Sequence, residues 1–507
     1  MTPAGRPTVA VIGAGIAGLA AAWELARASP GAGVPSPEVH VFERDLRPGG
    51  VLRSAPFGGR TLDLAADGFT SRRPEAVTLC EELGIGDELV PAAATGGSVL
   101  ARGRLRPLPA GLVSGVPTRW WPLACSGVLG PLESLRVARD LVVPHPGTRQ
   151  VTGDRSVGEI VADRLGRPVV ERLVDPVMGG GHAGSVDSLS AAAVEPVLIA
   201  ASHQPGSLMH RVGRTRRARE WTGTPAVRPS GSWSLAGGTT RLVDRLVERL
   251  RAGGVAVHTG TAVEALVRDG HPATGGRPQG GPRWRLVLAG PDEVGTGEGT
   301  FTADAVVCAL PATATATLLA LHAPVAAGLL TTVEYASVST VTVSVPVSAM
   351  RRPLSGAGFV VPQATTIDGR PALITGCTYL THKWPHLAVA DAELLRISVG
   401  RAGDLRPAVL DDDELAAAAF AQCAGVLSLT GPPSLAMVTR WDRGCPQYQV
   451  GHLVRVAEVD KAVAAVGGLA VAGAATRGVD IPACIGSGRE AGRRVLRSLT
   501  ADGSQVR

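Results

Sequence analysis

Residues 8–26 read TVAVIGAGIAGLAAAWELA and decide the fold, because three spaced glycines join a β-branched run to a helical one. The run Thr8–Ile12 predicts a buried strand, and the alanine-rich run after Gly18 predicts a helix. Gly13 permits a tight turn, Gly15 lets the backbone approach a pyrophosphate, and Gly18 lets the helix pack closely on the strand. The N-terminus of that helix would present N–H groups and a positive dipole to the phosphates.

An acidic residue ends the next predicted strand, Glu38–Glu43, whose sequence is EVHVFE. A carboxylate at Glu43 accepts hydrogen bonds from ribose hydroxyls and would repel a 2′-phosphate. Strand, glycines, helix, strand and acid in this order predict a dinucleotide-binding site of the Rossmann type. The alternative interpretation is a glycine-rich turn that holds no ligand.

The composition is that of a globular chain with room for about two or three domains. Of its 507 residues, 45% are hydrophobic and 19% charged, with a net charge of +6. The N-terminus lacks a signal-peptide pattern, and prolines or glycines interrupt the uncharged stretches 305–333 and 415–439. The seven cysteines are scattered and never form C-x-x-C, which favours reduced thiols and argues against a metal site. These features predict a cytoplasmic protein without a membrane-spanning helix.

A cluster of arginines lies in a stretch that we expect to be a polar loop; its members are Arg211, Arg214, Arg216, Arg217 and Arg219. Nucleic-acid binding would call for such arginines on a regular element with aromatic residues between them, and aromatic residues make up only 3% of the chain. We therefore predict no nucleic-acid partner. A solvated loop is the favoured interpretation, and attraction of an acidic substrate or a membrane surface is the alternative.

A second glycine pair bears on the choice between FAD and NAD. Gly49 and Gly50 precede Arg53 in the stretch RPGGVLRS, and Arg44 stands shortly before them. This arrangement resembles the pattern of FAD-dependent amine oxidases, and a nicotinamide enzyme has no need of it. The resemblance implies FAD as the cofactor.

Segments far apart in the chain are expected to return to this site. A strand over Val255–Thr259 is followed by Val263, whose backbone edge would lie against an adenine. Further strands are predicted at Ala305–Leu310 and Leu469–Gly473, and a last helix begins near Cys484. The N-terminus of that helix, aimed at an isoalloxazine, would stabilise an anionic reduced flavin. One nucleotide-binding domain is therefore predicted from residues 1–70, 225–312 and 440–507.

Five longer motifs carry a family resemblance over nearly the whole chain. They are DPVMGGGHAGSVDSLS (175–190), ITGCTYLTHKWPH (374–386), LLRISVGRAGD (394–404), CPQYQVGHLVRV (445–456) and AGAATRGVDIPACIGSG (472–488). With them the sequence resembles the oxygen-dependent, FAD-containing protoporphyrinogen and coproporphyrinogen oxidases. The likeness is strongest to the coproporphyrinogen III oxidases of Gram-positive and actinobacterial type.

The resemblance implies an α/β fold in three parts. A Rossmann-type, amine-oxidase-like FAD-binding domain would be joined by a helical domain over 85–210. A substrate-binding domain with a mixed sheet would span 313–439 together with 71–84. The residues implied to hold FAD are Gly13, Gly15, Gly18, Glu43, Arg44, Gly49, Gly50, Arg53, Val263, Gly473, Val479, Asp480 and Ile481.

The implied activity is oxidation of coproporphyrinogen III to coproporphyrin III in heme biosynthesis, with dioxygen as acceptor and release of hydrogen peroxide. Arg73 falls where relatives carry a basic residue beside the substrate, and Arg72 adjoins it. Arginine pairs well with the propionates of such a substrate, although both residues equally suit a solvated surface. Gly181 and His182 belong to the implied substrate site. No catalytic residue is assigned, since His182 is a candidate base and a structural histidine is the alternative.

Other implications concern partners and departures from the family pattern. Trp120 and Trp121, in a proline-bounded apolar stretch, suit a peripheral membrane contact of the helical domain, with buried aromatic packing as the alternative. A transient contact with the next enzyme of heme synthesis is also implied, and the oligomeric state stays open. The chain has Thr476 and Asp480 where the family commonly has an aromatic residue and a glycine.

Three alternative functions stay open. The nearest is oxidation of protoporphyrinogen IX. A flavin amine oxidase or desaturase of the same fold is more remote, because amine oxidases commonly use a lysine and an aromatic cage, and Lys383 and Lys461 are the only lysines here. A non-catalytic scaffold would predict decay of the C-terminal motif, which stands largely intact.

Overall fold

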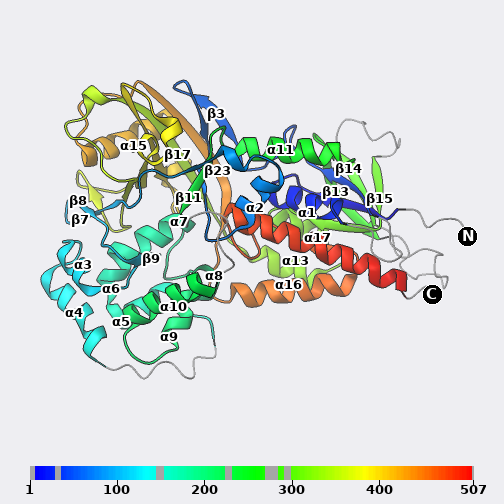
Figure 1. Ribbon diagram of the computed structural model, residues 1–507, viewed down its shortest axis with the longest axis horizontal. Coiled ribbons are helices and arrows are strands. Elements are labelled where there is room, and N and C mark those ends of the chain that lie inside the picture. The colour runs from blue at the N-terminus through cyan, green and yellow to red at the C-terminus, as the bar shows by residue number, and fades with distance from the viewer. Residues whose placement is uncertain are drawn as a thin grey trace, which may run out of the picture.

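The computed structural model of the protein describes residues 6–28, 36–143, 153–222, 231–268, 284–289 and 299–504. A parallel sheet between two layers of helices occupies one end of the molecule (Figure 1). A larger sheet and a group of short helices share the other end. The fold is α/β, as the glycine motif and the family resemblance predict.

Five parallel strands from distant parts of the chain form the first sheet. In spatial order they are β12 (Ala256–His258), β2 (Glu38–Phe42), β1 (Thr8–Ile12), β16 (Ala305–Cys308) and β24 (Leu469–Val471). All four neighbouring pairs run parallel. The central strands are short, rich in valine and almost fully buried, as expected for a sheet that is covered on both faces.

Helices cover both faces of this sheet. One face packs against α1 (Ile16–Ala26), α11 (Thr239–Ala252) and α17 (Ile481–Ser504). The other packs against α12 (Ala312–Leu319), α13 (Pro324–Thr331) and α16 (His452–Val466). Helices α12 and α13 were expected in the substrate-binding domain over 313–439, so that boundary is revised. Their buried alanines and leucines cover the second apolar face of the parallel sheet, which would otherwise be exposed to water.

A seven-stranded mixed sheet forms the second layer. Its spatial order is β23 (Leu435–Pro446), β17 (Tyr335–Pro346), β22 (Ala392–Val399), β21 (Ile374–Tyr379), β18 (Gly358–Val360), β7 (Ser98–Ala101) and β8 (Arg104–Pro107). The β18–β7 pair is parallel and the others are antiparallel. Helix α15 (Asp412–Leu427) covers one face and begins with a capping box, in which Asp411 and Glu414 accept each other's backbone N–H.

Two boundaries predicted from the sequence differ from this sheet. Strands β7 and β8 come from the range 85–210 that we expected to be helical, and β23 crosses the expected boundary at 440. The β7–β8 hairpin forms because Gly103, with a φ of 73°, permits the tight turn between Ala101 and its partner Arg104. The hairpin then completes the outer edge of the substrate sheet.

Short helices between residues 120 and 222 share a separate core. They include α3 (Trp120–Cys125), α4 (Pro131–Val142), α5 (Val157–Leu165), a wide helical stretch at Val170–Gly179, α7 (Gly180–His182), α9 (Pro196–Ser202) and α10 (Leu208–Thr222). The polar loop expected around Arg211–Arg219 was wrong, because this segment is part of α10. Leu208, Met209 and Val212 are buried at helical spacing and anchor it to the core.

No helix among the described residues is long and apolar enough to cross a membrane. The two tryptophans of α3 have different surroundings. Trp120 donates from Nε1 to Ser134 O at 2.8 Å, whereas Trp121 is 68% exposed. Leu132 and Leu135 on α4 are also exposed. A peripheral membrane contact through this surface stays a prediction.

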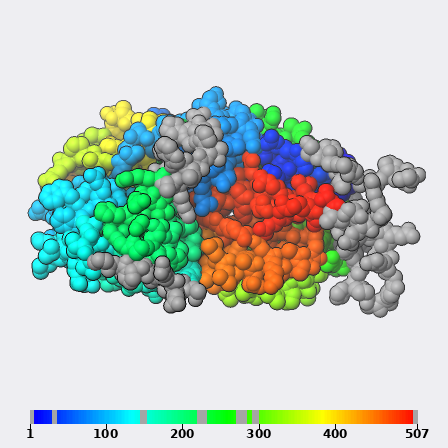
Figure 2. Space-filling model, turned by 60° about the horizontal axis from the view of Figure 1, so that its bottom comes forward, coloured from blue at the N-terminus to red at the C-terminus, as the bar shows by residue number. Residues whose placement is uncertain are grey.

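Figure 2 shows another face of the molecule, where α17 and α16 lie side by side, joined by the ion pair of Arg494 and Asp460 at 2.8 Å.

Candidate functional site: a nucleotide crevice and its surroundings

Four strand ends meet at one edge of the parallel sheet. Gly13 follows β1, Glu43 follows β2, Ala309 follows β16 and Ala472 follows β24. The chain connections change direction beside β1, since β2 lies on one side of it and β16 on the other. In open α/β sheets, ligands bind in the crevice at the carboxyl ends of the strands at such a point. The strand ends beside β1 are therefore where this rule places a ligand crevice, and the predicted cofactor residues lie there.

The three glycines after β1 have three different surroundings. Gly13 has a φ of 98°, and a Cβ there would lie 2.6 Å from Ala309 O. A Cβ at Gly18 would lie 1.9 Å from Gly13 O, so this glycine allows α1 to pack on the turn. Gly15 faces open space, with nothing within 4 Å of a Cβ. The backbone at Gly15, at the N-terminus of α1, is thus the part that a ligand can approach.

The second glycine pair joins the first turn. Gly49 N donates to Ala14 O at 2.8 Å, and a Cβ at Gly50 would lie 3.4 Å from the Cα of Gly15. Both glycines have positive φ angles, 110° and 57°. Arg53 holds this turn, because its Nε donates to Gly50 O at 2.9 Å and its Nη2 contacts Asp45 at 2.9 Å. The structure therefore brings Gly13, Gly15, Gly49, Gly50 and Arg53 together.

Glu43 points back to the glycine turn. Its Oε2 accepts from Ala14 N at 2.8 Å and its Oε1 accepts from Asp45 N at 3.0 Å. Each oxygen has a second lone pair, so the carboxylate can also accept from ribose hydroxyls. The backbone carbonyl of Glu43 accepts from Thr261 N at 2.8 Å, which places the start of β13 (Ala262–Arg268), with Val263, beside the same strand end. The side chain of Arg44 is 83% exposed and forms an ion pair with Asp45, so the role of Arg44 at the cofactor stays a prediction.

The segment 473–480 forms a loop before α17, and hydrogen bonds within the loop and to α17 hold it in place. Gly473 N donates to Ser487 Oγ at 3.1 Å, and Thr476 Oγ1 donates to Gly473 O at 2.8 Å. Asp480 accepts from Ala483 N at 2.8 Å and so acts as the N-cap of α17. The predicted roles of Asp480, Val479 and Ile481 at the cofactor stay predictions. This capping explains why an aspartate can replace the family's usual glycine.

The predicted substrate residues lie in two separate places. Arg73 is 47% exposed and faces Asp480 at 3.9 Å, beside the loop that precedes α17. Arg72 is exposed and contacts only Thr70. His182 donates from Nδ1 to Met178 O at 2.9 Å, and Gly181 beside it is exposed. Among the described residues, no hydrogen bond or ion pair joins the arginines to Gly181 or His182.

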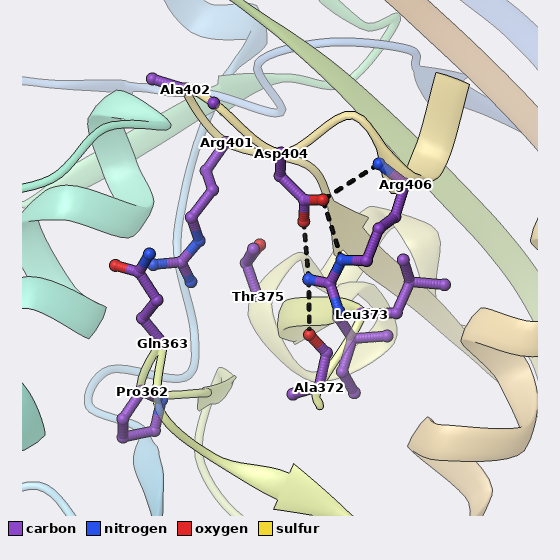
Figure 3. A pocket seen from close by; sticks show the side chains of 11 residues that line it. Pro362, Gln363, Ala372, Leu373, Thr375, Arg401, Ala402, Asp404 and Arg406 are labelled. Carbon is purple, nitrogen blue, oxygen red and sulfur yellow. Dashed lines mark hydrogen bonds and ion pairs between the residues drawn. The ribbon is translucent and has the colours of Figure 1, made fainter. Parts of the chain in front are cut away.

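A polar cavity of about 390 Å³ lies where the seven-stranded sheet meets the helical part. Arg401 and Gln363 point toward each other across it, while Arg406 pairs with Asp404 (Figure 3). Arg401 also contacts Asp175 at 3.4 Å, and the adjacent Ala402 N donates to Ala183 O at 2.7 Å. Arg401 therefore connects this cavity to the segment that carries His182.

A family model for flavin-containing amine oxidoreductases matches residues 16–496, which include every element of the crevice after β1. The chain belongs to this family. It is 33% identical to the coproporphyrinogen III oxidase of Propionibacterium freudenreichii, over 97% of this chain and 91% of that one. It is 30% identical to the coproporphyrinogen III oxidase of Bacillus subtilis, over 96% and 97% of the two chains.

A solved structure from Exiguobacterium supports the same family. Its provisional name is protoporphyrinogen oxidase, and it superposes with a TM-score of 0.79 at 28% identity. The match covers 98% of this chain and 99% of that one. The family resemblance and the fold predicted from the sequence are therefore confirmed.

In this flavin-containing oxidoreductase, a tyrosine and a histidine that we had given no role connect the two predicted halves of the site. Tyr448 donates to Ala474 O at 2.6 Å and accepts from Gly478 N at 2.7 Å. Its ring stacks on His452 at 3.8 Å, and His452 Nε2 donates to Thr476 O at 2.7 Å. Just before them, Gln447 donates to His182 O at 2.9 Å. The motif CPQYQVGH contained the signal, but nothing in the sequence shows what it contacts.

A half-buried charge cluster holds the segment that follows β4 (Arg60–Asp63). Asp67 accepts from Lys383 Nζ at 3.1 Å through both oxygens and from Trp384 Nε1 at 3.0 Å. Arg396 donates to Ala65 O at 3.1 Å. Burial alone would raise the pKa of Asp67, but Lys383, Arg396 and Trp384 outweigh it and hold this pKa at about 2. The sequence contained the KWPH motif but gave no reason to pair it with Asp67.

Among the described residues, the cysteines near the crevice and the potential metal ligands lack what thiol chemistry and metal binding require. The seven cysteines form no disulfide. Burial raises the pKa of Cys445 to about 11 and that of Cys484 to about 12, so both thiols stay protonated at neutral pH. Within the described ranges, no group of three or more His, Cys, Asp or Glu side chains is placed to hold a metal ion.

His452 predicts a pH dependence of stability. Burial lowers its pKa to about 4 from the usual 6.5. Between these two pH values, His452 is protonated in the unfolded chain and neutral in the folded chain. Stability should therefore fall as the pH drops through this window, by about 2 kcal/mol between pH 7 and pH 5. His452→Gln, whose amide can still donate to Thr476 O, should lose this dependence in urea unfolding. The exposed His210→Gln should keep it, and equal slopes in all three proteins would contradict the assignment.

Proposed function

We propose that this protein binds FAD and oxidises coproporphyrinogen III to coproporphyrin III, with dioxygen as acceptor and hydrogen peroxide as the second product. The observation that carries the proposal is the similarity to coproporphyrinogen III oxidases over 97% and 96% of the chain. A match of this extent includes all three segments that meet at the crevice. The activity would belong to heme biosynthesis in the cytoplasm.

The crevice residues fit FAD. The open space at Gly15 and the N-terminus of α1 suit a pyrophosphate, because backbone N–H groups and the helix dipole favour an anion there. The carboxylate of Glu43 has acceptor capacity left for ribose hydroxyls. The N-terminus of α17 follows the loop 473–480 at the same sheet edge and would stabilise negative charge on a reduced ring.

When bound, the flavin supplies a two-electron acceptor for the methylene-bridge C–H bonds and passes the electrons to dioxygen. The chain itself binds and orients the substrate. Arg73 offers an accessible guanidinium to a propionate, and Arg401, which lines the polar cavity, is a second candidate. His182 Nδ1 donates to Met178 O, and no hydrogen bond to Nε2 comes from the described residues, so Nε2 is the ring nitrogen that could contact a pyrrole N–H.

The lysines argue against amine oxidation. Lys383 is committed to Asp67, and it also lies over the Trp384 ring at 5.0 Å. Lys461 is 79% exposed on α16 beside Glu458. Neither ammonium group is therefore available to act beside a flavin in the way that amine oxidases commonly require.

An aerobic fluorescence assay tests the proposal directly. Purified protein with added FAD should produce porphyrin fluorescence from coproporphyrinogen III faster than from protoporphyrinogen IX, because two additional propionates can pair with arginine. We expect a preference of roughly tenfold in kcat/KM, which corresponds to one charge-assisted hydrogen bond.

Two outcomes would change the proposal. A preference for protoporphyrinogen IX would keep the family and overturn the choice of substrate. A flavin-bound protein that is inactive on both porphyrinogens would redirect the search to amine substrates.

A further inference from the structure

A large cavity lies away from the nucleotide crevice, at the outer edge of the seven-stranded sheet. Its volume is about 1020 Å³, and its walls are the β7–β8 hairpin, the loop around Arg352, the turn around Asp368 and the C-terminal end of α15. Figure 1 shows β7, β8 and α15 at the end of the molecule opposite the parallel sheet. The cavity opens on the face covered by α15, whereas Arg396 on the other face holds the segment near Ala65. It is therefore a separate compartment.

Apolar side chains form part of the floor of this otherwise mainly polar cavity. Leu100, Ile367 and Tyr379 line it and are 7%, 7% and 2% exposed. Leu354 and Val426 extend the apolar surface toward the opening. Such a floor favours the apolar body of a ligand, because removing apolar surface from water is the main source of affinity in pockets of this kind.

The rim of the cavity is cationic. Arg102 and Arg104 stand on the hairpin, and Arg352 stands on the opposite wall. In the part of the chain that the structure describes, none of the three forms an ion pair within 4.0 Å. Asp368 is the one acid among the lining residues, so three arginines minus one aspartate leave a charge of +2. Arg102 also acts electrostatically on Glu133 of α4, without forming a close ion pair with it. Guanidinium groups on two walls suit a ligand with carboxylates at its periphery.

Tyr379 adds a hydrogen-bond donor at the floor. Burial raises the pKa of its hydroxyl, which therefore stays protonated at neutral pH. The side chain is 2% exposed and lines the cavity. Its hydroxyl can therefore donate to an acceptor on a ligand bound there.

We propose that this cavity binds a carboxylated porphyrin and holds it outside the catalytic crevice. The inference rests on the proposed function, because coproporphyrin is the product of that reaction. An aromatic disc with propionates at its edge matches the apolar residues of the floor, the rim of arginines on two walls and a volume at the upper end of the range for ligand sites. A single small anion would leave most of the floor unfilled.

The test is a binding titration on the flavin-bound enzyme with coproporphyrin III, followed by quenching of porphyrin fluorescence. Wild type should bind porphyrin at two sites for each flavin. Arg102→Ala combined with Arg352→Ala should weaken one site by about tenfold or more and leave the other unchanged. The matched control combines Arg351→Ala with Arg370→Ala, two exposed arginines that do not line the cavity. It removes the same charge and should bind like wild type.

Several outcomes would overturn the proposal. One is wild-type binding by the double rim variant, and another is an equal loss in both double variants, which would indicate a general effect of charge. Displacement by a long-chain fatty acid with no porphyrin binding would assign the cavity to another carboxylated apolar ligand. Tyr379→Phe, which removes only the hydroxyl, should weaken the same site by a few-fold.

Measuring turnover of coproporphyrinogen III distinguishes a failure of this inference from a failure of the proposed function. The rim variant should keep the wild-type kcat/KM for coproporphyrinogen III, since the rim lies outside the crevice. Turnover without a second porphyrin site would overturn the inference and keep the function. A porphyrin site that depends on the rim arginines, in a protein without turnover, would keep the cavity as a porphyrin site and overturn the function.

Discussion

Replacing Gly15 with alanine is expected to leave the fold intact and to weaken FAD binding by roughly tenfold to hundredfold, equivalent to an overpacking cost of about 1–3 kcal/mol. Gly15 has a φ of −66°, which alanine adopts without strain, and its Cβ would meet no protein atom within 4 Å. The added methyl group would instead fill the space through which a pyrophosphate approaches the backbone. Titration of the flavin-free protein with FAD measures the loss.

Two other glycines provide the controls. Gly328→Ala changes an exposed glycine of α13 that also faces open space, and it should leave FAD affinity unchanged. Gly18→Ala would place a Cβ 1.9 Å from Gly13 O, so it should destabilise the fold itself. The unfolding free energy of Gly15→Ala should stay within about 1 kcal/mol of wild type. Wild-type FAD affinity in Gly15→Ala would show that no ligand approaches this backbone.

Replacing Lys383 with methionine should destabilise the protein by about 2–3 kcal/mol, because it leaves Asp67 without its closest cation. Asp67 and Lys383 are 19% and 22% exposed, so the effect is smaller than for a fully buried pair. The segment before Asp67 is held to the seven-stranded sheet by Arg396 and Trp441, and we expect turnover to fall as well if this segment shifts. Urea unfolding at neutral pH measures the first effect, and the porphyrin assay measures the second.

The other lysine is the matched control for this prediction. Lys461→Met removes an exposed ammonium group 3.9 Å from Glu458 and should change stability by less than about 0.5 kcal/mol. Equal effects of the two substitutions would contradict the role assigned to Lys383.

The same pair also predicts a dependence on acid. The folded pKa of Asp67 is about 2, below the usual 3.8, so its ionised form stabilises the fold above pH 3.8. That stabilisation is lost as the pH falls from 3.8 to about 2. The advantage of wild type over Lys383→Met should therefore shrink in this range and persist above it.

Local sequence was sufficient for the glycine turns because each depends on neighbours in the chain. The tight turn at Gly13 and the strand that ends at Glu43 arise from residues within one strand–turn–helix–strand unit. The expectations for the helical range 85–210 and for the arginine-rich segment failed where packing partners decide. Residues 98–107 have too short a pattern to show that they extend a sheet whose other strands begin more than 200 residues later. Likewise, Leu208, Met209 and Val212 turn an arginine-rich segment into a helix only because a core exists to bury them.

The sequence by itself determined the nucleotide-binding unit, the family and the three segments that supply the crevice. These are encoded by short-range geometry, such as glycines that permit positive φ angles and a carboxylate at a strand end. Only the tertiary structure decided the contacts between distant side chains. It joined Tyr448 and His452 to the loop before α17, Asp67 to Lys383, and Asp480 to the start of α17. The physical reason is that a buried polar group must find a partner, and the fold, not the spacing in the chain, determines which partner lies within reach.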